Sequence, residues 1–465
     1  MADFDLVVIG AGPGGYVAAI RAAQLGLKTA VVERDRPGGV CGNWGCIPSK
    51  AILADAELFV DARAAVKAGV LVGELQADFG RVIERSRKVA EQQAKGVEFL
   101  FKKNKITLLP GTGRLARGGV EVITGGGATT RLAAPKVLLA TGSGERTLPG
   151  LEIDGEVVLT SREALDSRAL PASVIVIGGG AVGVEFAYIY ASFGAQVTVV
   201  EMADMLLPGM DVDLGRELGR SFAKQKIDVL TGHRFERCTR TAEGATITVT
   251  GSSGPRTLQA ARVLVAVGRA PLSQDLGLEA CGVRMERGFV VVDGTMQTSV
   301  PGVYAIGDLV GPLLLAHAAS EQGVLAAEVI AGKHSGDTAG IEPSRIPLCI
   351  YCQPEVAAIG LSEADARALG HDVQTGTFPF RALGKAMATG HTEGWVKLVT
   401  EKRYGRILGV HMIGRGVTDL IAEAGLARTL EATTDEVVGT VHAHPTLAEA
   451  VREAALVAMG AAINV

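Results

Sequence analysis

The chain has 465 residues, of which 48% are hydrophobic and 21% are charged, and 61 of them are glycines. This length exceeds what one hydrophobic core usually organises, so we expect two to four domains. The net charge of −4 gives no basic surface for nucleic acid. The most apolar runs, at 174–184 and 454–465, are too short to span a bilayer, and no signal peptide is visible. We therefore expect a cytoplasmic protein without nucleic-acid or membrane partners.

The N-terminal segment has the pattern of a strand, a turn, a helix and a second strand. An apolar strand at 6–9 leads into a glycine turn at 10–15, which opens a helix at 16–25. A second strand, at 28–32, ends on Glu33. This order is typical of the βαβ unit that binds dinucleotides.

The same order of elements recurs in the middle of the chain. Strands at 174–177 and 196–200 flank a glycine turn at 178–183 and a helix that ends at Phe193, and the second strand ends on Glu201. The first glycine and the glutamate are 23 residues apart in both units (33 − 10 and 201 − 178). This internal duplication predicts two nucleotide-binding domains.

The glycines of such a fingerprint let the backbone turn and approach a pyrophosphate, and the glutamate binds a ribose hydroxyl. Two glycine turns in an ordinary α/β sheet are the alternative, but both matches have the required strand, helix and glutamate. Because Glu201 would repel a 2′-phosphate, the second site should prefer NAD to NADP. The candidate binding residues are Gly10, Gly12, Gly14, Gly15 and Glu33 in the first unit, and Gly178, Gly180, Gly183 and Glu201 in the second.

The rest of the chain divides into three kinds of segment. A charged stretch at about 53–103 predicts helix, and a β-meander follows with turns at Gly111–Gly113 and Gly125–Gly127. Strand-like runs then end at two further glycine turns, Thr141-Gly142-Ser143 and Gly268-Arg269. From about residue 341, short strands and helices alternate without a glycine fingerprint, which indicates a separate α+β domain.

We therefore predict an α/β fold with two Rossmann-like domains and a C-terminal α+β domain. The first Rossmann-like domain is expected at 1–145 and continues at 271–340. The second is expected at 146–270, and the C-terminal domain at 341–465.

Two of the six cysteines, Cys41 and Cys46, lie close together in a glycine-rich segment. Pro48 suits the first turn of a helix through 51–59, so Cys46 would lie at a helix N-terminus, where the dipole and Lys50 favour a thiolate. Cys41 can close a small, exchangeable disulfide with it. The alternative is two unrelated buried cysteines.

The other four cysteines are interpreted as packing residues. Cys349 and Cys352 form a Cys-x-x-Cys pattern, but in a strand-like run residues three apart point to opposite faces. Cys238 and Cys281 have apolar neighbours.

The string from Cys41 to Lys50 resembles the redox motif of the pyridine-nucleotide–disulfide oxidoreductases, in the Ile-Pro-Ser-Lys form typical of dihydrolipoamide dehydrogenases. The similarity covers nearly the whole chain and includes 12–20, 141–143 and 307–308. It implies FAD in the first domain, NAD in the second, and a homodimer held by the C-terminal domain. The chain departs from the family's usual residues at Trp44, Leu272 and Ala448.

The resemblance also implies roles for individual residues. Cys41 would be the thiol that exchanges with substrate and Cys46 the one facing the flavin, with Lys50 paired to Glu185. His444, oriented by Glu449, would be the acid/base supplied by the opposite subunit. Further cofactor contacts are implied at Gly113, Thr141, Gly142, Ser143, Gly268, Asp308, Leu315, Ala316 and His317.

The implied reaction is the oxidation of protein-bound dihydrolipoamide by NAD. The lipoyl group would come from a 2-oxoacid dehydrogenase complex, a glycine cleavage system or a dedicated lipoate-binding protein. One alternative is a reductase for a glutathione-like disulfide or for mercuric ion, and another is a non-catalytic flavoprotein scaffold. A metal site at His442 and His444 is a further alternative, but two histidines are too few ligands, and we predict no metal.

Overall fold

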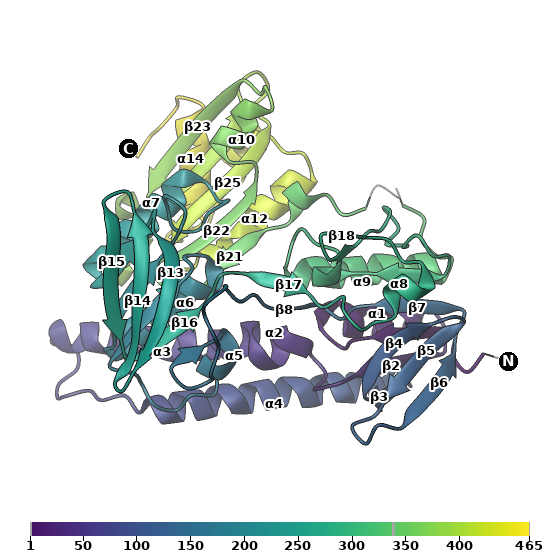
Figure 1. Ribbon diagram of the computed structural model, residues 1–465. Coiled ribbons are helices and arrows are strands. Elements are labelled where there is room, and N and C mark those ends of the chain that lie inside the picture. The colour runs from purple at the N-terminus through teal and green to yellow at the C-terminus, as the bar shows by residue number, and fades with distance from the viewer. Residues whose placement is uncertain (1, 337–339, 465) are drawn as a thin grey trace.

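The computed structural model describes residues 2–336 and 340–464. The outermost residues of the first and last predicted domains, and 337–339 of the third segment, lie outside these ranges. Three five-stranded sheets organise the described part of the chain (Figure 1). The predicted α/β fold with a C-terminal α+β domain is confirmed, whereas the exact domain boundaries stay a prediction.

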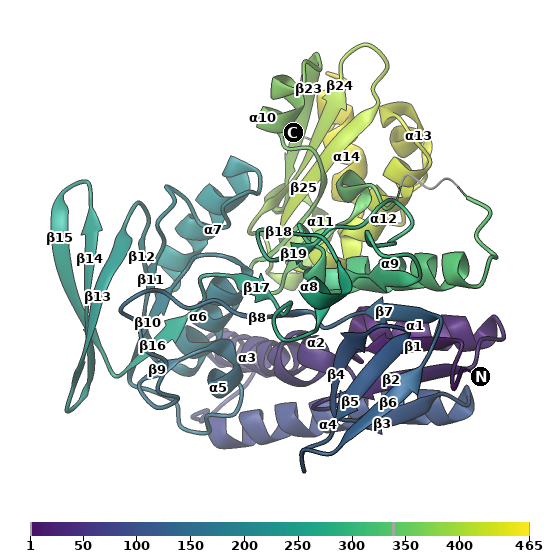
Figure 2. The same cartoon turned by 45° about the vertical axis from the view of Figure 1, so that its right-hand side comes forward.

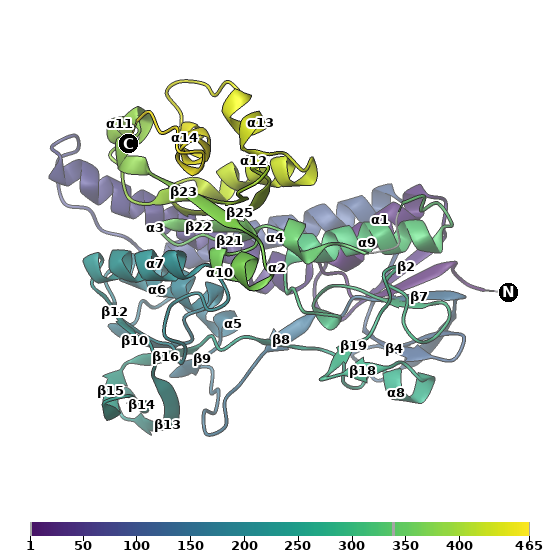
Figure 3. The same cartoon turned by 90° about the horizontal axis from the view of Figure 1, so that it is seen from above.

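The first sheet is parallel and contains the N-terminal strand at its centre. Its order is β20 (Val303–Ala305), β7 (Lys136–Leu139), β1 (Leu6–Ile9), β2 (Thr29–Glu33) and β3 (Thr107–Pro110). Leu6 and Val8 face the helices α1 (Pro13–Gln24) and α9 (Ala316–Ile330), which lie side by side (Figure 3). Val7 and Ile9 face the antiparallel meander β4 (Thr112–Ala116), β5 (Gly119–Ile123) and β6 (Thr129–Ala133). Because both faces are covered, β1 is apolar throughout.

The second sheet repeats this plan. Its order is β12 (Ile227–Leu230), β11 (Gln196–Val200), β10 (Ser173–Ile177), β16 (Arg262–Val265) and β9 (Val158–Leu159), all parallel. The helices α6 (Ala181–Phe193) and α7 (Val212–Lys224) cover one face. The other face packs against an antiparallel sheet of β13 (Arg234–Thr241), β14 (Gly244–Gly251) and β15 (Gly254–Ala260), seen at the edge of Figure 2. The duplication therefore extends to the antiparallel sheets, and the second of these was not predicted.

The C-terminal sheet is antiparallel. Its order is β21 (Leu348–Ile350), β22 (Glu355–Gly360), β25 (Ile407–Gly414), β24 (Trp395–Glu401) and β23 (Val373–Pro379). The helices α12 (Val417–Thr429), α13 (Thr434–Gly439) and α14 (Glu449–Ala458) pack on one face of it. Two short helices, α10 (Glu363–Ala368) and α11 (Gly384–Thr389), lie in the connections.

The charged stretch at about 53–103, which was predicted as helix, belongs to two long helices. Short α2 (Gly39–Trp44) is followed by α3 (Cys46–Lys67) and α4 (Phe79–Lys103), which lies along the lower edge of Figure 1. The helix that was predicted to begin near Cys46 and to run through 51–59 therefore continues further, to Lys67. Gly69 and Gly73, both at positive φ, separate α3 from α4, since L side chains rarely adopt this conformation.

Short elements join the two parallel sheets. Strands β8 (Ser143–Glu145) and β17 (Arg269–Pro271) pair antiparallel between them, and α5 (Ser161–Ala164) lies beside β9 and β16. In the first domain, α8 (Leu278–Cys281) and the pair β18 (Met285–Glu286) and β19 (Phe289–Val290) complete the structure.

One predicted turn was only partly right. The hairpin between β5 and β6 does turn at Gly125–Gly127, and Gly111 does separate β3 from β4 at positive φ, but Gly113 lies inside β4. A Cβ on Gly113 would lie 2.8 Å from the Ile9 side chain. The glycine there permits close packing against β1 instead of forming a turn.

The cysteines outside the redox segment pack at or near the core. Cys352 is fully buried, and Cys238, Cys281 and Cys349 are half-buried beside apolar clusters. Burial raises the pKa of the Cys349 thiol to about 11. Among the described residues, no helix is both long and apolar enough to cross a membrane.

Candidate redox and nucleotide-binding sites

Cys41 and Cys46 form a disulfide, with their Cα atoms 4.7 Å apart. Cys41 lies in α2 and Cys46 is the first residue of α3, so the bond joins two successive helices. Gly45 precedes α3 and provides no side-chain cap. Cys46 therefore lies at an uncapped helix N-terminus, where the dipole favours a negative charge on sulfur. Both the pairing and the helix start were predicted.

One turn after Cys46, Lys50 forms an ion pair with Glu185 of α6. The Lys50 Nζ atom lies 2.9 Å from each carboxylate oxygen of Glu185, whose side chain is only 7% exposed. The main-chain N–H of Tyr351 donates to the same carboxylate at 3.0 Å, and the Tyr351 ring centroid lies 4.4 Å from Nζ. The predicted pair thus joins α3 to α6 beside the end of β21 in the C-terminal sheet. Tyr351 was not predicted as its neighbour.

The two fingerprint glutamates have matching contacts. Glu33 accepts hydrogen bonds from the N–H groups of Ala11 at 2.7 Å and Asp35 at 2.8 Å. Glu201 accepts from Gly179 at 2.6 Å and Ala203 at 2.7 Å. Each carboxylate is therefore fixed beside its glycine turn, at the carboxyl end of the strand next to the central one, where dinucleotides bind in such sheets.

The glycines of the first fingerprint fall into two groups. A Cβ on Gly10 would overlap the Ala140 carbonyl, one on Gly15 would overlap the Gly10 carbonyl, and one on Gly14 would lie 2.8 Å from a carbonyl of α9. These three allow the protein to pack against itself. Gly12 is different, since the nearest heavy atom to its Cβ position is 4.0 Å away and it caps α1 without a side chain. The open space and free N–H groups fit a pyrophosphate.

The second fingerprint repeats this division. A Cβ on Gly178 would overlap the Ala266 carbonyl, and one on Gly183 would overlap the Gly178 carbonyl. Gly180 has no heavy atom within 4 Å of its Cβ position and caps α6 without a side chain. The residues of both units therefore fit two dinucleotides.

The predicted cofactor residues around Ser143 form one polar cluster. The Ser143 hydroxyl donates to Asp308 and accepts from Arg269 Nε at 2.7 Å. Arg269 also bonds the Ser143 carbonyl at 2.6 Å and lies 3.4 Å from Glu145. Thr141 donates to a main-chain carbonyl of 272 at 2.9 Å. The sequence indicated Arg269 only as part of a turn. Its contacts in this cluster depend on the β8–β17 pairing, which was not predicted.

Two glycines beside this cluster, Gly142 and Gly268, have positive φ and no heavy atom within 4 Å of a Cβ position. Asp308 lies after β20, and Leu315, Ala316 and His317 lie at the start of α9. His317 Nε2 is 2.8 Å from the Pro347 carbonyl, a contact with the segment leading into the C-terminal sheet. These residues surround the carboxyl ends of β7 and β20.

His444 and Glu449 form the predicted pair, 2.9 Å apart between Nδ1 and Oε1. Glu449 also accepts from the Thr446 N–H at 2.8 Å. Burial acts to raise the Glu449 pKa, but the bonds from Thr446 and His444 outweigh it and hold the pKa below its ordinary value. The carboxylate is thus kept charged beside an imidazole that is 77% exposed. Because Nδ1 bonds Glu449, Nε2 is the ring nitrogen that remains for another partner.

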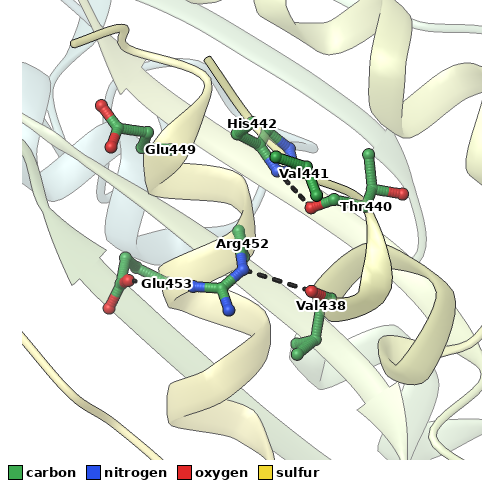
Figure 4. A pocket seen from close by; sticks show the side chains of 7 residues that line it. All are labelled: Val438, Thr440, Val441, His442, Glu449, Arg452 and Glu453. Carbon is green, nitrogen blue, oxygen red and sulfur yellow. Dashed lines mark hydrogen bonds and ion pairs between the residues drawn. The ribbon is translucent and has the colours of Figure 1, made fainter. Parts of the chain in front are cut away.

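His442 has separate contacts from those of His444. Its buried ring lies 2.7 Å from Glu423 Oε1 and 3.0 Å from the Thr440 carbonyl. It lines a cavity of about 220 Å³ with Val438, Thr440, Val441, Glu449, Arg452 and Glu453 (Figure 4). Because the two rings bond different carboxylates, they do not converge on one point.

Comparison with known proteins agrees with this geometry. Residues 4–323 match the family profile described as pyridine nucleotide-disulphide oxidoreductase, and 346–455 match the dimerisation domain of the same family. The dihydrolipoyl dehydrogenase of Bacillus subtilis is 44% identical, and the alignment covers 99% of each chain. The protein of the same name from Chlorobaculum tepidum is 47% identical, over 98% of this chain and 97% of that one.

Solved structures give the same result. The crystal structure of LpdA from Mycobacterium tuberculosis superposes with a TM-score of 0.89 at 30% identity, covering 97% of this chain and 98% of that one. The flavoprotein disulfide reductase RclA from Escherichia coli has a TM-score of 0.86 at 24% identity over 98% and 99% of the two chains, which shows the fold alone. The resemblance noted in the sequence is confirmed, and the chain belongs to the pyridine nucleotide-disulphide oxidoreductase family.

Proposed function

We propose that this chain is a dihydrolipoyl dehydrogenase, which oxidises protein-bound dihydrolipoamide to lipoamide with NAD as acceptor. The observation that carries this proposal is the Cys41–Cys46 disulfide at the start of α3. Relatives of this name match over nearly the full chain. The enzyme contains FAD, which supplies a two-electron carrier between the dithiol and NAD.

The cysteines carry the exchange with substrate. One thiol of dihydrolipoamide attacks Cys41 Sγ, which forms a mixed disulfide and breaks the bond to Cys46. Cys46 leaves as a thiolate that the helix N-terminus stabilises. The second substrate thiol then displaces Cys41, so lipoamide departs and both cysteines are left reduced. His444 takes up the proton that the attacking thiol loses, and Glu449 holds its ring.

The remaining predicted residues hold cofactors in this proposal. Glycine fingerprints and glutamates bind the two adenosine halves, the first in 1–145 with 271–340 and the second in 146–270. Lys50, fixed by Glu185, and the cluster of Ser143 and Asp308 lie toward the flavin. The sequence features above support these assignments, together with the open positions at Gly12 and Gly180.

The proposed assembly is a homodimer formed through 341–465. The match to a dimerisation domain supports it. In this assembly His444 serves the disulfide of the opposite subunit. The substrate arrives on a lipoylated carrier protein or domain, and we expect the enzyme in the cytoplasm.

Substitution of Cys41 tests the proposal most directly. The Cys41→Ser variant should lose lipoamide turnover and leave Cys46 as a free thiolate. A long-wavelength charge-transfer absorbance should then be present without any reductant. Cys281→Ser is the matched control, because that half-buried thiol lies outside the proposed site. It should keep both activity and the ordinary spectrum.

Two results would contradict the proposal. Full lipoamide activity in Cys41→Ser would remove the disulfide from the mechanism. A wild-type enzyme that reduces glutathione disulfide with NADPH faster than it oxidises dihydrolipoamide with NAD would favour the other reductase. A flavoprotein with neither activity would favour the scaffold.

A further inference from the structure

Trp44 lies between the two redox cysteines, at the end of α2, and the proposed mechanism gives it no role. Its indole is enclosed by two guanidinium groups from distant parts of the chain. The ring centroid is 4.3 Å from Arg87 Cζ, in α4, and 4.1 Å from Arg162 Cζ, in α5. Such short cation–π contacts are favourable, and arginine makes them by stacking its planar group on the ring.

Hydrogen bonds complete this enclosure. The indole Nε1–H donates to Asp35 Oδ2 at 2.8 Å, and Arg162 lies 3.5 Å from the same oxygen. Asp35 follows β2, so the ring is attached to three elements in addition to its own helix. We call Trp44, Arg87, Arg162 and Asp35 the indole clamp.

The neighbouring residue, Asn43, is also held by hydrogen bonds. The Asn43 carbonyl accepts from Arg87 Nη2 at 2.6 Å. The Asn43 side-chain amide donates to the carbonyls of Pro37 at 3.1 Å and Gly39 at 3.0 Å. Asn43 is 1% exposed. Arg87 therefore holds two consecutive residues of the segment between the cysteines.

None of these contacts involves a cysteine sulfur. When a substrate dithiol opens the disulfide, the covalent closure of the 41–46 segment is lost, but the indole clamp and the Asn43 bonds remain. Without them, the four residues between the cysteines would gain conformational freedom on reduction, and both thiols would be less ordered. The clamp also joins the segment to α5, which packs beside β9 and β16 of the NAD domain.

We propose that Trp44 is a positioning residue that keeps the reduced cysteines in separate places, so that Cys46 stays on the flavin side and Cys41 on the substrate side that the proposed function assigns to them. This inference rests on the proposed function, because it concerns the dithiol state of that redox centre. It acts through the cysteines and does not require that Trp44 touch substrate. It also explains a residue at which the chain departs from the usual family pattern.

Selective alkylation of the reduced flavoenzyme tests this proposal. The holoenzyme is reduced with dithiothreitol and trapped with iodoacetamide, and labelling at each cysteine is measured by peptide mass spectrometry. In the wild type, Cys41 should be labelled at least about tenfold faster than Cys46, because thiol reactivity follows access as well as thiolate character. In Trp44→Ala this ratio should fall at least about threefold, as the clamp contacts are lost. The charge-transfer absorbance of the reduced enzyme should fall with it.

Matched variants separate an effect on the positions of the cysteines from an effect on folding. Trp44→Phe keeps an aromatic ring between the two guanidiniums and should keep the ratio within about twofold of wild type. Phe99→Ala removes an aromatic ring that is 64% exposed on the same helix as Arg87, and should leave the ratio unchanged. If Trp44→Ala does not fold with flavin, Arg162→Leu removes one face of the clamp from an exposed position and should lower the ratio in the same direction.

An unchanged ratio in both Trp44→Ala and Arg162→Leu would overturn the proposal. So would an equal fall in Phe99→Ala, because the effect would then be general destabilisation. The reductant here is a chemical dithiol, so the labelling ratio does not depend on lipoamide as substrate. If the wild type lacks lipoamide activity but its labelling ratio falls in Trp44→Ala, the proposed function is refuted and the inference about the indole clamp still holds.

Discussion

The carboxylate of Glu185 lies 2.9 Å from the ammonium of Lys50, although 135 residues separate them in the chain. The contact joins the helix that begins at Cys46 to the helix that begins at the second fingerprint. Because the Glu185 side chain is almost fully buried, the ammonium of Lys50 and the Tyr351 N–H take the place of water around its carboxylate.

Neutralising Glu185 should therefore impair the reaction. Hydrogen bonds between charged groups contribute about 1.5–3 kcal/mol, so Glu185→Gln should lower kcat roughly tenfold to a hundredfold. Steady-state lipoamide oxidation measures this. The control is Glu91→Gln, the same change in an exposed pair with Lys95 on α4, where ion pairs contribute little. Equal rates in both variants would show that the buried pair has no part in turnover.

Cofactor choice should depend on Glu201. This carboxylate is buried and fixed by two main-chain N–H groups, so a 2′-phosphate would meet an immobile negative charge. NADH should exceed NADPH by at least about tenfold in kcat/KM, which corresponds to about 1.4 kcal/mol.

The duplicated fold offers a matched control for this prediction. Glu201→Ala should narrow the NADH preference, whereas Glu33→Ala, in the same place of the first unit, should weaken flavin retention and leave the preference unchanged. Comparable kcat/KM values for the two nucleotides in the wild-type enzyme would contradict the assignment.

Acid stability should depend on His411, which lies in the buried middle of β25. Its Nε2 is 3.0 Å from the Leu361 carbonyl, and Nδ1 is buried with no hydrogen-bond partner among the residues that the structure describes. Burial lowers the His411 pKa, and nearby Lys397 lowers it further, against the opposite effects of the Leu361 bond, Asp211 and Asp365. The folded state therefore favours neutral His411.

The lowered pKa of His411 determines how stability changes with pH. An unfolded histidine takes up a proton below about pH 6.5 and the folded one does not, so the stability present above that pH is lost as the pH falls. Tm should decline from pH 6.5 to pH 5, and His411→Gln, which keeps a donor for Leu361, should decline less steeply. Lys397 pairs with Asp211 and Asp213 nearby, and this pairing should change little between pH 6.5 and pH 5. Burial acts against both charges, but hydrogen bonds and opposite charges outweigh it, so the Asp211 pKa is lowered and the Lys397 pKa is raised. Parallel pH slopes in the two proteins would exclude His411 as the cause.

The sequence predicted those features whose chemistry is local. Strand β11 was predicted with its observed bounds, and the Cys41–Cys46 pair and its helix start were also predicted, because glycine fingerprints and a helix N-terminus are encoded within a few residues. The pairing of Lys50 with Glu185 came from family resemblance and not from the residues themselves.

Features made by distant contacts were missed. Tyr351 meets Glu185 through a main-chain N–H, which has no signature in the sequence. Arg269 and Ser143 are brought together by the short β8–β17 pair. The sheet β13–β15 could have been found, since Ala245, Ile247 and Val249 alternate as buried residues along β14. The boundary between α3 and α4 was not predicted, because its glycines lie in an otherwise charged, helix-like stretch.

Activity should require two subunits. His444 is 77% exposed and lies on the C-terminal domain, 398 residues after Cys46 (444 − 46). If the pair with Glu449 serves the opposite chain, the two active sites lie at an isologous interface. Inactive Cys41→Ser chains mixed with inactive His444→Ala chains should then form heterodimers with one intact site each.

Random exchange predicts the size of the effect. Half of the dimers should be mixed, each with one functional site of two, so about a quarter of wild-type lipoamide activity should return. That site combines the cysteines of the His444→Ala chain with the histidine of the Cys41→Ser chain. A mixture of Cys41→Ser with the double variant Cys41→Ser/His444→Ala is the control, because no pairing restores a site, and it should stay inactive. Since subunit exchange can be verified separately by mass-labelled chains, exchange without recovered activity would mean that His444 acts on the disulfide of its own chain.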